Sequence, residues 1–429
     1  MRKVYKRILI LGFTIITLLA CQTVQQWVSP IRPPLPTAAP PPTEIDPTTQ
    51  QLQIFTELWT IVDEEYLYED FNGADWNAIA VEFGEKIEMG LTDDEFYVAM
   101  DEMLLRLNDE HSVFLSPQQA ADEDQEYAGN QDYVGIGVYL LSVPERDRAV
   151  ILLTFPDGPA HQAGLRMRDS ILTVDRMPVL DENGNIGDAL RGSEGSVVRL
   201  RVQTPGEAPR EIEVARARVN GALPTPFRLT TTTSGERIGY IFIPTFSIST
   251  ISELVGDAYW EMTTDAPLDG LIIDNRFNDG GVDTELEGTL GYFVDGLMGN
   301  FISRSNRRPL EIKGSDLRDS QTIPLVVLVG ENTVSYGEVF AGVLQDAGRA
   351  TVLGETTEGN VETLWGYDFS DGSRAWIAHE AFRPLNNPMD DWEATGIIPD
   401  EIIPVFWDEH TFETDPAIQR AIQLLIKSP

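Results

Sequence analysis

The chain contains 429 residues, with 31 basic and 69 acidic side chains and a formal net charge of −38 at pH 7. A surface this acidic repels nucleic acids and anionic lipid headgroups, so we exclude both as ligands. The single cysteine excludes an internal disulfide and a zinc-thiolate site. The sequence shows no Walker loop, internal repeat or metal-ligand cluster, so no metal and no cofactor is expected.

The amino terminus has the pattern of an export signal. A basic start is followed by an apolar run from Ile8 to Ala20, which is short for a bilayer span and predicts a signal peptide over residues 1–20. Leu18-Leu-Ala-Cys21 resembles a bacterial lipobox, which implies lipid attachment at Cys21. We therefore expect an exported bacterial lipoprotein that is anchored to a membrane and faces the periplasm or the cell exterior.

Two segments of different composition follow the signal peptide. Residues 21–49 are rich in Pro and Thr, which favours an extended, lipid-anchored linker without a core of its own. From Gln50 onward, apolar residues recur at the three- and four-residue spacings of amphipathic helices: Leu52, Phe55, Leu58, Trp59, Val62 and Tyr66. This pattern predicts an N-terminal helical subdomain over residues 50–128.

Residues 129–218 form a second module. Two of its segments resemble PDZ domains of the processing-protease type: Tyr133-Val-Gly-Ile-Gly-Val138 and Gly158-Pro-Ala-His-Gln-Ala-Gly-Leu165. The resemblance implies that Gly135, Ile136 and Gly137 present backbone N–H groups to a peptide's C-terminal carboxylate, while the peptide adds an antiparallel strand. The alternative is that these glycines only form a turn between strands. One departure is Arg168, which stands where relatives usually carry glycine.

The remaining residues, 219–429, alternate apolar strands with helical patterns. Strands are predicted near residues 238–243, 270–274, 324–329 and 351–354, and helices near 249–263, 283–297 and 337–347. This alternation favours a parallel or mixed sheet with helices on its faces. Ligands of such sheets bind at strand ends, where this sequence places Gly280 and Ser335.

Ser335 follows an apolar strand and opens an amphipathic helix, which is a favourable position for a serine nucleophile. About sixty residues upstream, another buried strand leads into the pair Gly280-Gly281. If the two strand ends converge, the N–H groups of Tyr336 and of Gly280 or Gly281 can form an oxyanion hole. Taken alone, a serine at this position could instead only cap the helix.

The residues around both strand ends resemble the carboxy-terminal processing proteases. The matching segments are Asp274-Asn-Arg-Phe-Asn-Asp-Gly-Gly281 and Glu338-Val-Phe-Ala-Gly-Val-Leu-Gln-Asp-Ala-Gly-Arg-Ala350. The resemblance extends over residues 50–429 and implies a multidomain protein with both α+β and α/β parts. Its parts would be an N-terminal helical subdomain, a PDZ-like β-rich module and a crotonase-like α/β protease core. It also implies a serine peptidase in which Ser335 attacks the scissile carbonyl group.

The resemblance fails at the general base. In most of that family the base is a lysine twenty-five residues after the serine, but Gly354-Glu-Thr-Thr-Glu-Gly-Asn360 has Asn360 at that position. An amide cannot accept the serine proton. The lysines that follow the signal region are few: Lys86, Lys313 and Lys427. An active enzyme therefore needs a base of another residue type.

Histidine is the next candidate. Leu107-Asn-Asp-Glu-His-Ser-Val-Phe-Leu-Ser-Pro117 resembles the segment that supplies the base in the tricorn-protease branch, and Glu393-Ala-Thr-Gly-Ile-Ile-Pro-Asp400 resembles the segment that supplies a glutamate there. The resemblance implies a site with Ser335 as nucleophile, His111 as base and Glu393 as the group that orients the imidazole. Two readings stay open: His111 as a packing or surface residue, and Glu393 as a turn residue.

We therefore interpret the chain as an envelope-located serine endopeptidase or C-terminal processing peptidase. Its partners would be protein or peptide substrates, bound through free C-termini, and a membrane reached through the lipid anchor. A catalytically inactive, peptide-binding pseudopeptidase is the main alternative, because it would explain Asn360 directly. A carrier of apolar ligands is a weaker alternative, since a carrier has no need of a serine at this helix start.

Overall fold

The computed structural model describes residues 46–109, 111–127 and 132–426. The predicted signal peptide, Cys21 and most of the predicted linker lie outside these residues. In the described part of the chain, no helix is both long enough and apolar enough to cross a bilayer. The chain divides into a unit of residues 1–50 and a unit of residues 51–429, and the second unit contains nearly all of the elements below.

The first helix, α2 (Pro47–Glu65), begins at Pro47 rather than at the expected Gln50. Proline suits the first position of a helix because the N–H that it lacks would have no partner there. The side chain of Asp46 accepts a hydrogen bond from the Thr49 N–H at 3.2 Å, as a helix-capping residue does. The helix therefore starts within the Pro-rich segment.

Further helices complete the N-terminal part: η1 (Phe71–Gly73), α3 (Trp76–Glu88) and α4 (Asp93–Leu105). Asp75 caps α3, and Thr92 and Glu95 form a capping box at the start of α4. The buried faces of these helices share one hydrophobic core with Ala375 and Ile377, from the C-terminal part of the sequence. The helices therefore pack against residues of the C-terminal part instead of burying their apolar faces only against one another.

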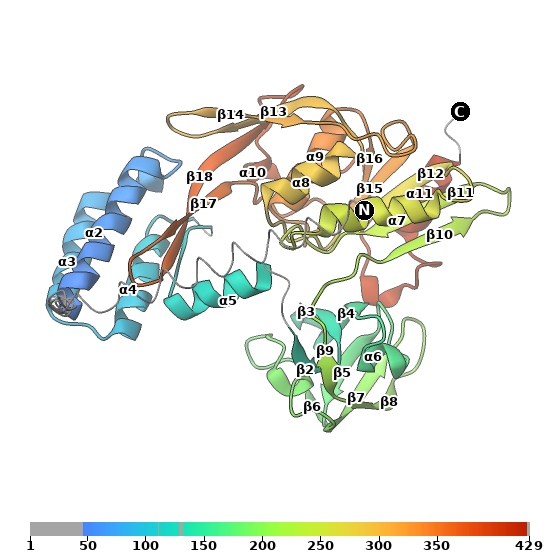
Figure 1. The fold of residues 1–429 in the computed structure, drawn as a ribbon, viewed down its shortest axis with the longest axis horizontal. Helices are drawn as coiled ribbons and strands as arrows, with labels where there is room; N and C mark the ends of the chain where they lie inside the picture. Colours follow the sequence, from blue (N-terminus) through green and yellow to red (C-terminus); the bar gives the residue numbers. More distant parts are fainter. Residues whose placement is uncertain (1–45, 110, 128–131, 427–429) are drawn as a thin grey trace, which may run out of the picture. The chain divides into compact units, whose positions relative to one another are not determined.

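An antiparallel sheet connects the helical part to the C-terminal part (Figure 1). Its strands are β1 (Val113–Leu115), β13 (Gly296–Ile302), β14 (Arg307–Ile312), β17 (Thr363–Asp368) and β18 (Arg374–Pro384). Strand β1 pairs with β18, with Val113 opposite Trp376, and helix α5 (Pro117–Tyr127) follows β1. Since His111 lies just before β1, this pairing fixes the place to which the N-terminal part delivers the histidine.

The next module is rich in β-structure. Its elements are β2 (Tyr133–Gly135), β3 (Val138–Val143), η2 (Pro144–Arg146), β4 (Arg148–Thr154), α6 (Pro159–Gln162), β5 (Ser170–Val174), β6 (Met177–Pro178), η3 (Asp188–Leu190), β7 (Val197–Gln203), β8 (Arg210–Ala215) and β9 (Ala217–Val219). The main sheet has the order β3-β4-β5-β7-β8, and β2 pairs with β9. Strand β3 is thus an edge strand, which leaves one side available for an added strand.

Arg168 ties this module to the C-terminal part of the chain. Its φ angle of 78° lies in the left-handed region that favours glycine. The guanidinium donates to Asp415 at 2.9 Å and lies 4.7 Å from the centre of the Trp407 ring. Arg276 donates to the same Asp415 oxygen at 2.9 Å. Asp415 therefore joins the β-rich module to the segment that precedes Gly280.

The C-terminal part is built on a mixed sheet with the order β10-β11-β12-β15-β16-β19. Strand β10 is antiparallel to β11, and the other neighbours are parallel. The strands are β10 (Phe227–Thr231), β11 (Arg237–Phe242), β12 (Gly270–Asp274), β15 (Leu325–Val329), β16 (Thr351–Gly354) and β19 (Glu401–Ile402). Because β12 and β15 are adjacent and parallel, the loops that carry Gly280 and Ser335 leave the sheet from the same edge.

Helices cover both faces of this sheet (Figure 1). They are α7 (Ile251–Met262), α8 (Asp283–Gly291), α9 (Tyr336–Asp346), α10 (Trp392–Thr395), η4 (Trp407–Glu409) and α11 (Pro416–Leu425). Side chains alternate along each strand: Ile273 and Val327 join the core under α7, α8 and α9, whereas Ile272 and Val326 join the core under α11. The expected mixed α/β architecture is confirmed.

One predicted helix is too long. Residues 283–297 were expected to be helical, but α8 ends at Gly291 and β13 begins at Gly296. Gly296 has a φ angle of 98°, which turns the chain out of the helical direction. The buried Phe293 and Val294 between them continue an apolar pattern that resembles a helix in the sequence.

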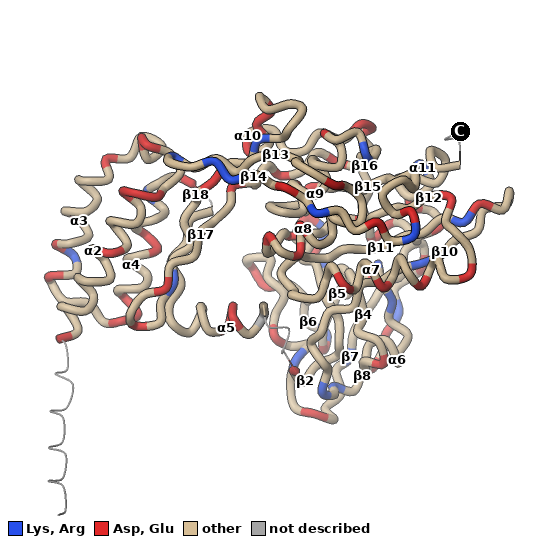
Figure 2. Tube along the Cα trace, turned by 45° about the horizontal axis from the view of Figure 1, so that its top comes forward, with Lys and Arg blue, Asp and Glu red and all other residues tan. Residues whose placement is uncertain are grey.

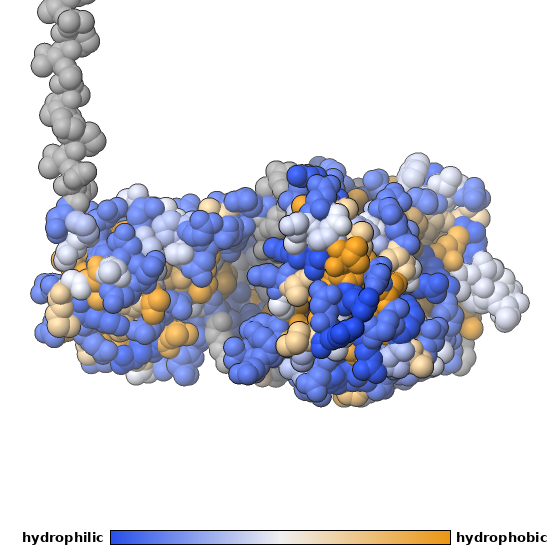
Figure 3. All heavy atoms as spheres, turned by 90° about the horizontal axis from the view of Figure 1, so that it is seen from below, coloured by the Kyte–Doolittle hydropathy of each residue, from blue (hydrophilic) through white to orange (hydrophobic). Residues whose placement is uncertain are grey.

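The charges of the described residues agree with the acidic composition. Figure 2 shows acidic residues on helices, strands and loops, with fewer basic residues among them. The face in Figure 3 is mostly hydrophilic and is interrupted by small apolar patches.

Candidate active site

Ser335 lies in a strained turn between β15 and α9. Its φ and ψ angles are 55° and −126°, a combination that a residue with a side chain rarely adopts. Such strain costs about 1–3 kcal/mol and is concentrated at functional sites. A serine on a sharp strand-to-helix turn is also how α/β hydrolases expose a nucleophile. Helix-capping residues ordinarily have extended backbone angles, so this conformation is unusual for a simple helix cap.

The glycine pair packs directly against this serine. Gly280 has a φ angle of 87°, and a Cβ atom at this position would lie 3.0 Å from Ser335 Oγ and 3.1 Å from the Tyr336 nitrogen. The Val334 N–H donates to the Asn278 carbonyl at 2.9 Å, which holds the two loops together. The two strand ends converge, as expected, and only glycine leaves room for the close approach.

The hydrogen bonds at the glycine pair distinguish the candidate oxyanion donors. The Gly280 N–H donates to the Asn278 side chain at 3.0 Å and is therefore occupied. The N–H groups of Gly281 and Tyr336 have no hydrogen-bond partner among the described residues. Of the two glycines predicted for this role, Gly281 is the one with an available donor.

Glu338 links Ser335 to the loop that contains Asn360. Its Oε2 atom accepts hydrogen bonds from the N–H groups of Ser335 at 3.2 Å and of Asn360 at 2.8 Å. Its Oε1 atom accepts from the Gly359 N–H at 2.9 Å and from the Thr357 hydroxyl. Burial raises the pKa of Glu338, while these donors oppose the shift. The loop that carries the family's lysine position thus lies beside the serine.

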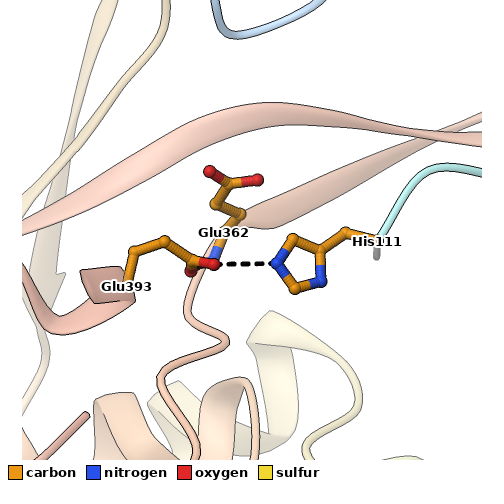
Figure 4. Close-up of side chains that lie close together, drawn as sticks. All are labelled: His111, Glu362 and Glu393. Carbon is orange, nitrogen blue, oxygen red and sulfur yellow. Dashed lines mark hydrogen bonds and ion pairs between the residues drawn. The ribbon is translucent and has the colours of Figure 1, made fainter. Parts of the chain in front are cut away.

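Glu393 continues this network toward His111. It lies in the first turn of α10, and its Oε2 atom accepts from the N–H groups of Val361 at 2.7 Å and Glu362 at 3.1 Å. Its Oε1 atom lies 2.8 Å from His111 Nε2, the contact drawn as a dashed line in Figure 4. The carboxylate is thus held by the backbone and oriented toward the imidazole.

His111 is fixed at both its backbone and its ring. The Asp109 carboxylate accepts hydrogen bonds from the N–H groups of His111 at 3.0 Å and Ser112 at 2.7 Å. The hydrogen bond with Glu393 raises the pKa of His111, against the opposing effect of burial. In this ring orientation, Nδ1 is the nitrogen left to accept a proton. Within the described ranges, no hydrogen bond joins His111 to Ser335.

Glu362 is a site residue that the sequence analysis missed. It is 4% exposed, and burial raises its pKa to about 7. The Tyr68 hydroxyl donates to its Oε1 atom. The only signal in the sequence is its position two residues after Asn360, which does not reveal that the side chain is buried beside His111.

Two of the three predicted peptide-binding residues, Ile136 and Gly137, line a groove in the β-rich module. Gly137 has a φ angle of 76°, and the carbonyl groups of Ile136 and Gly137 accept from Ala160 and Phe155. A cavity of about 240 Å³ lies between this turn, the edge strand β3 and the segment near η3. Its walls include Ile136, Gly137, Leu140, Leu190 and Arg191. Gly135 is the last residue of β2 and directly precedes Ile136 in the sequence, and it is not among the residues that line the cavity.

Comparison with known proteins matches three segments to family models. Residues 237–403 match peptidase family S41, residues 47–105 match the tricorn protease C1 domain, and residues 156–204 match the PDZ domain. A carboxyl-terminal-processing protease of Picosynechococcus sp. is 30% identical over 401 residues, which are 88% of this chain and 90% of that protein.

One further relative and one solved structure are similar to the chain over most of its length. A chloroplastic C-terminal processing peptidase of Tetradesmus obliquus is 31% identical over 345 residues, covering 76% of this chain and 72% of that protein. The solved structure of a photosystem II D1 C-terminal processing protease has a TM-score of 0.55 and 27% identity, covering 83% of this chain and 93% of that one. The fold and these matches define a serine peptidase with a PDZ domain. The chain belongs to the carboxyl-terminal processing proteases of peptidase family S41.

Proposed function

We propose that the chain is an active peptidase with Ser335 as nucleophile, His111 as general base and Glu393 as the group that orients the imidazole. The observation that carries the proposal is the hydrogen bond of 2.8 Å between His111 and Glu393, residues 282 positions apart in the sequence. The strained turn at Ser335 supports it. Glu338 bonds to Ser335 and Asn360, and Glu393 bonds to the next residue, Val361.

In this mechanism, His111 Nδ1 accepts the proton of the Ser335 hydroxyl while Oγ attacks the scissile carbonyl carbon. The N–H groups of Tyr336 and Gly281 stabilise the negative charge that develops on the carbonyl oxygen. The imidazolium, paired with Glu393, then gives its proton to the leaving amine as the peptide bond breaks. Water hydrolyses the acyl-enzyme by the same two steps, with His111 again taking and returning one proton.

A pseudopeptidase is the second candidate function. It is favoured by Asn360 at the family's lysine position and by the lack, in the described part of the chain, of a hydrogen bond between Ser335 and His111. Catalytic hydrogen bonds are often long or unaligned before substrate binds, so this geometry is compatible with an active enzyme. The two functions differ in whether Ser335 reacts with an electrophile.

Covalent labelling separates the two functions. The full chain is treated with a fluorophosphonate, digested and examined by mass spectrometry. An active triad should give one adduct at Ser335, and His111→Ala should slow the labelling because the hydroxyl loses its base. Labelling that is absent, or equally fast in His111→Ala, would contradict the proposed site.

We further propose that the PDZ domain binds the free C-terminus of a substrate. The groove combines an edge strand with apolar walls and a turn that contains Gly137 at a φ angle of 76°. A peptide that ends in an apolar residue with a free carboxylate should bind about tenfold or more tightly than its C-terminal amide, because hydrogen bonds to a charged group contribute about 1.5–3 kcal/mol. Calorimetry with Ser335→Ala, which cannot cleave the peptide, measures both affinities. Equal affinities would show that the turn has only a structural role.

The envelope location is also a proposal. It is supported by the signal-peptide pattern and by Cys21 within the lipobox-like segment. In this proposal, the acyl chain on Cys21 anchors the peptidase to a membrane, and residues 21–49 form the linker between the anchor and the folded part.

A further inference from the structure

His111, Glu362 and Glu393 form a cluster whose third member has no part in the proposed triad. Nε2 or Nδ1 of His111 and one carboxylate oxygen from each glutamate lie within 4.8 Å of one another. Figure 4 shows Glu362 next to the His111–Glu393 pair, with its carboxylate to one side of the line between them. The three residues come from three separate segments of the chain, so no ligand spacing is visible in the sequence.

One oxygen of Glu362 lacks a partner. The residue is 4% exposed, and its Oε2 atom has no hydrogen bond to any of the described residues. A buried polar atom without a partner is unfavourable by about 1–3 kcal/mol. A buried carboxylate oxygen beside a histidine and a second carboxylate is well placed to coordinate a cation.

We propose that this cluster is a binding site for a divalent transition-metal ion, with Zn²⁺ as the best match. The ligands are His111 Nε2, the Oε1 atom of Glu393 and the Oε2 atom of Glu362. Imidazole nitrogen and carboxylate oxygen are both ligand atoms that zinc binds, and three protein ligands leave a fourth tetrahedral position for water. Mg²⁺ and Ca²⁺ are poorer matches because they prefer oxygen ligands in larger number.

The surrounding hydrogen bonds already orient all three ligands. Oε2 of Glu393 is held by two backbone N–H groups, while Oε1 of Glu362 is held by the Tyr68 hydroxyl. Asp109 holds the backbone at His111. Bonds to zinc of about 2.0–2.2 Å place tetrahedral ligands about 3.4 Å apart, so small side-chain rotations would complete the site. Outer-shell contacts of this kind strengthen metal binding about 10–100-fold.

Metal binding here would inhibit the peptidase. The ion would take Glu393 and one imidazole nitrogen out of the His111–Glu393 pair, which the proposed mechanism requires. This inhibitory consequence rests on the proposed function, whereas metal binding itself does not. Zinc would thus act as a reversible inhibitor that a chelator removes.

Calorimetric titration of the metal-free full chain, without a histidine tag, tests the site directly. Wild-type protein should bind one Zn²⁺ and no Mg²⁺ at this site. Glu362→Gln should weaken zinc binding at least about tenfold, and Tyr68→Phe should weaken it within the range of about 10–100-fold expected for an outer-shell contact. His379→Gln is the matched control, because His379 also pairs with a glutamate, Glu65, at 3.0 Å but belongs to no such three-residue cluster in the described chain.

The possible outcomes distinguish a failure of the proposed metal site from a failure of the proposed catalytic triad. The proposed site would be overturned if wild-type protein shows no saturable zinc binding, or if Glu362→Gln and Tyr68→Phe both bind zinc as tightly as wild type. Loss of zinc binding in His379→Gln would also overturn it. If Glu362→Gln does not fold, the comparison of Tyr68→Phe with wild type decides, with a zinc-dependent rise in the thermal unfolding midpoint as a second measurement. Zinc that binds at these residues without slowing peptide hydrolysis would contradict the triad and leave the metal site standing.

Discussion

Ser335→Ala is expected to abolish peptide hydrolysis while the protein stays folded. Removing the nucleophile of a serine peptidase lowers kcat by a factor on the order of 10⁴ to 10⁶. Alanine keeps the Cβ atom that already tolerates the φ angle of 55°, so the backbone strain is unchanged. If the hydroxyl also caps α9, its loss costs about 0.5–2 kcal/mol. Turnover of a fluorogenic peptide and thermal unfolding measure the two effects.

Ser303→Ala is the control for this experiment. Ser303 lies in the turn between β13 and β14, where its hydroxyl accepts the Asn306 N–H at 3.0 Å, away from the network of Ser335. Its loss should leave turnover within about twofold of wild type, as for most substitutions away from a functional site. Full activity in Ser335→Ala would exclude this serine as the nucleophile.

His111→Ala is expected to lower turnover by about 10²–10⁴-fold, the usual contribution of a general base. Glu393→Gln should lose less, because Glu393 orients the imidazole without transferring the proton. Both are measured as kcat and kcat/KM on the same peptide, with EDTA present. His161→Ala is the control, since His161 is an exposed residue of α6. Full activity in His111→Ala would remove this histidine from the mechanism.

The pH dependence gives the same hypothesis a second test. Only the neutral imidazole can accept the Ser335 proton, so activity should fall as pH drops through the pKa of His111. The hydrogen bond to Glu393 raises that pKa above its ordinary value of 6.5, so the midpoint should lie above this value. Glu393→Gln removes the negative partner and should move the midpoint downward. A midpoint that does not move between the two proteins would contradict the pairing.

Many helices and strands of the fold could be predicted from local patterns in the sequence. The apolar spacings from Leu52 to Tyr66 are those of a helix, and the runs at 238–243 and 324–329 are those of buried strands. These predictions succeeded because period and burial are set by neighbouring residues. The predicted helix at 283–297 failed at its end, since an apolar run does not reveal where Gly296 turns the chain into β13.

Sequence motifs identified the candidate site residues, but physical reasoning from the sequence alone did not predict that all of them lie close together in space. Ser335, Gly281 and Tyr336 were named from strand ends that adjacent parallel strands make converge. The nearness of His111 to Glu393 depends on β1 pairing with β18, a contact between residues more than 250 positions apart. Resemblance to a family suggested this pair, whereas local physical chemistry did not.

Only the tertiary structure shows which individual groups at the site are buried and which already have hydrogen-bond partners. It shows that the Gly280 N–H is occupied and the Gly281 N–H is available. It also shows that Glu362 is buried with one free oxygen beside His111. The sequence fixes which groups can donate, accept or ionise. Burial and hydrogen-bond partners, which set their pKa values and availability, arise from segments that meet only in the folded chain.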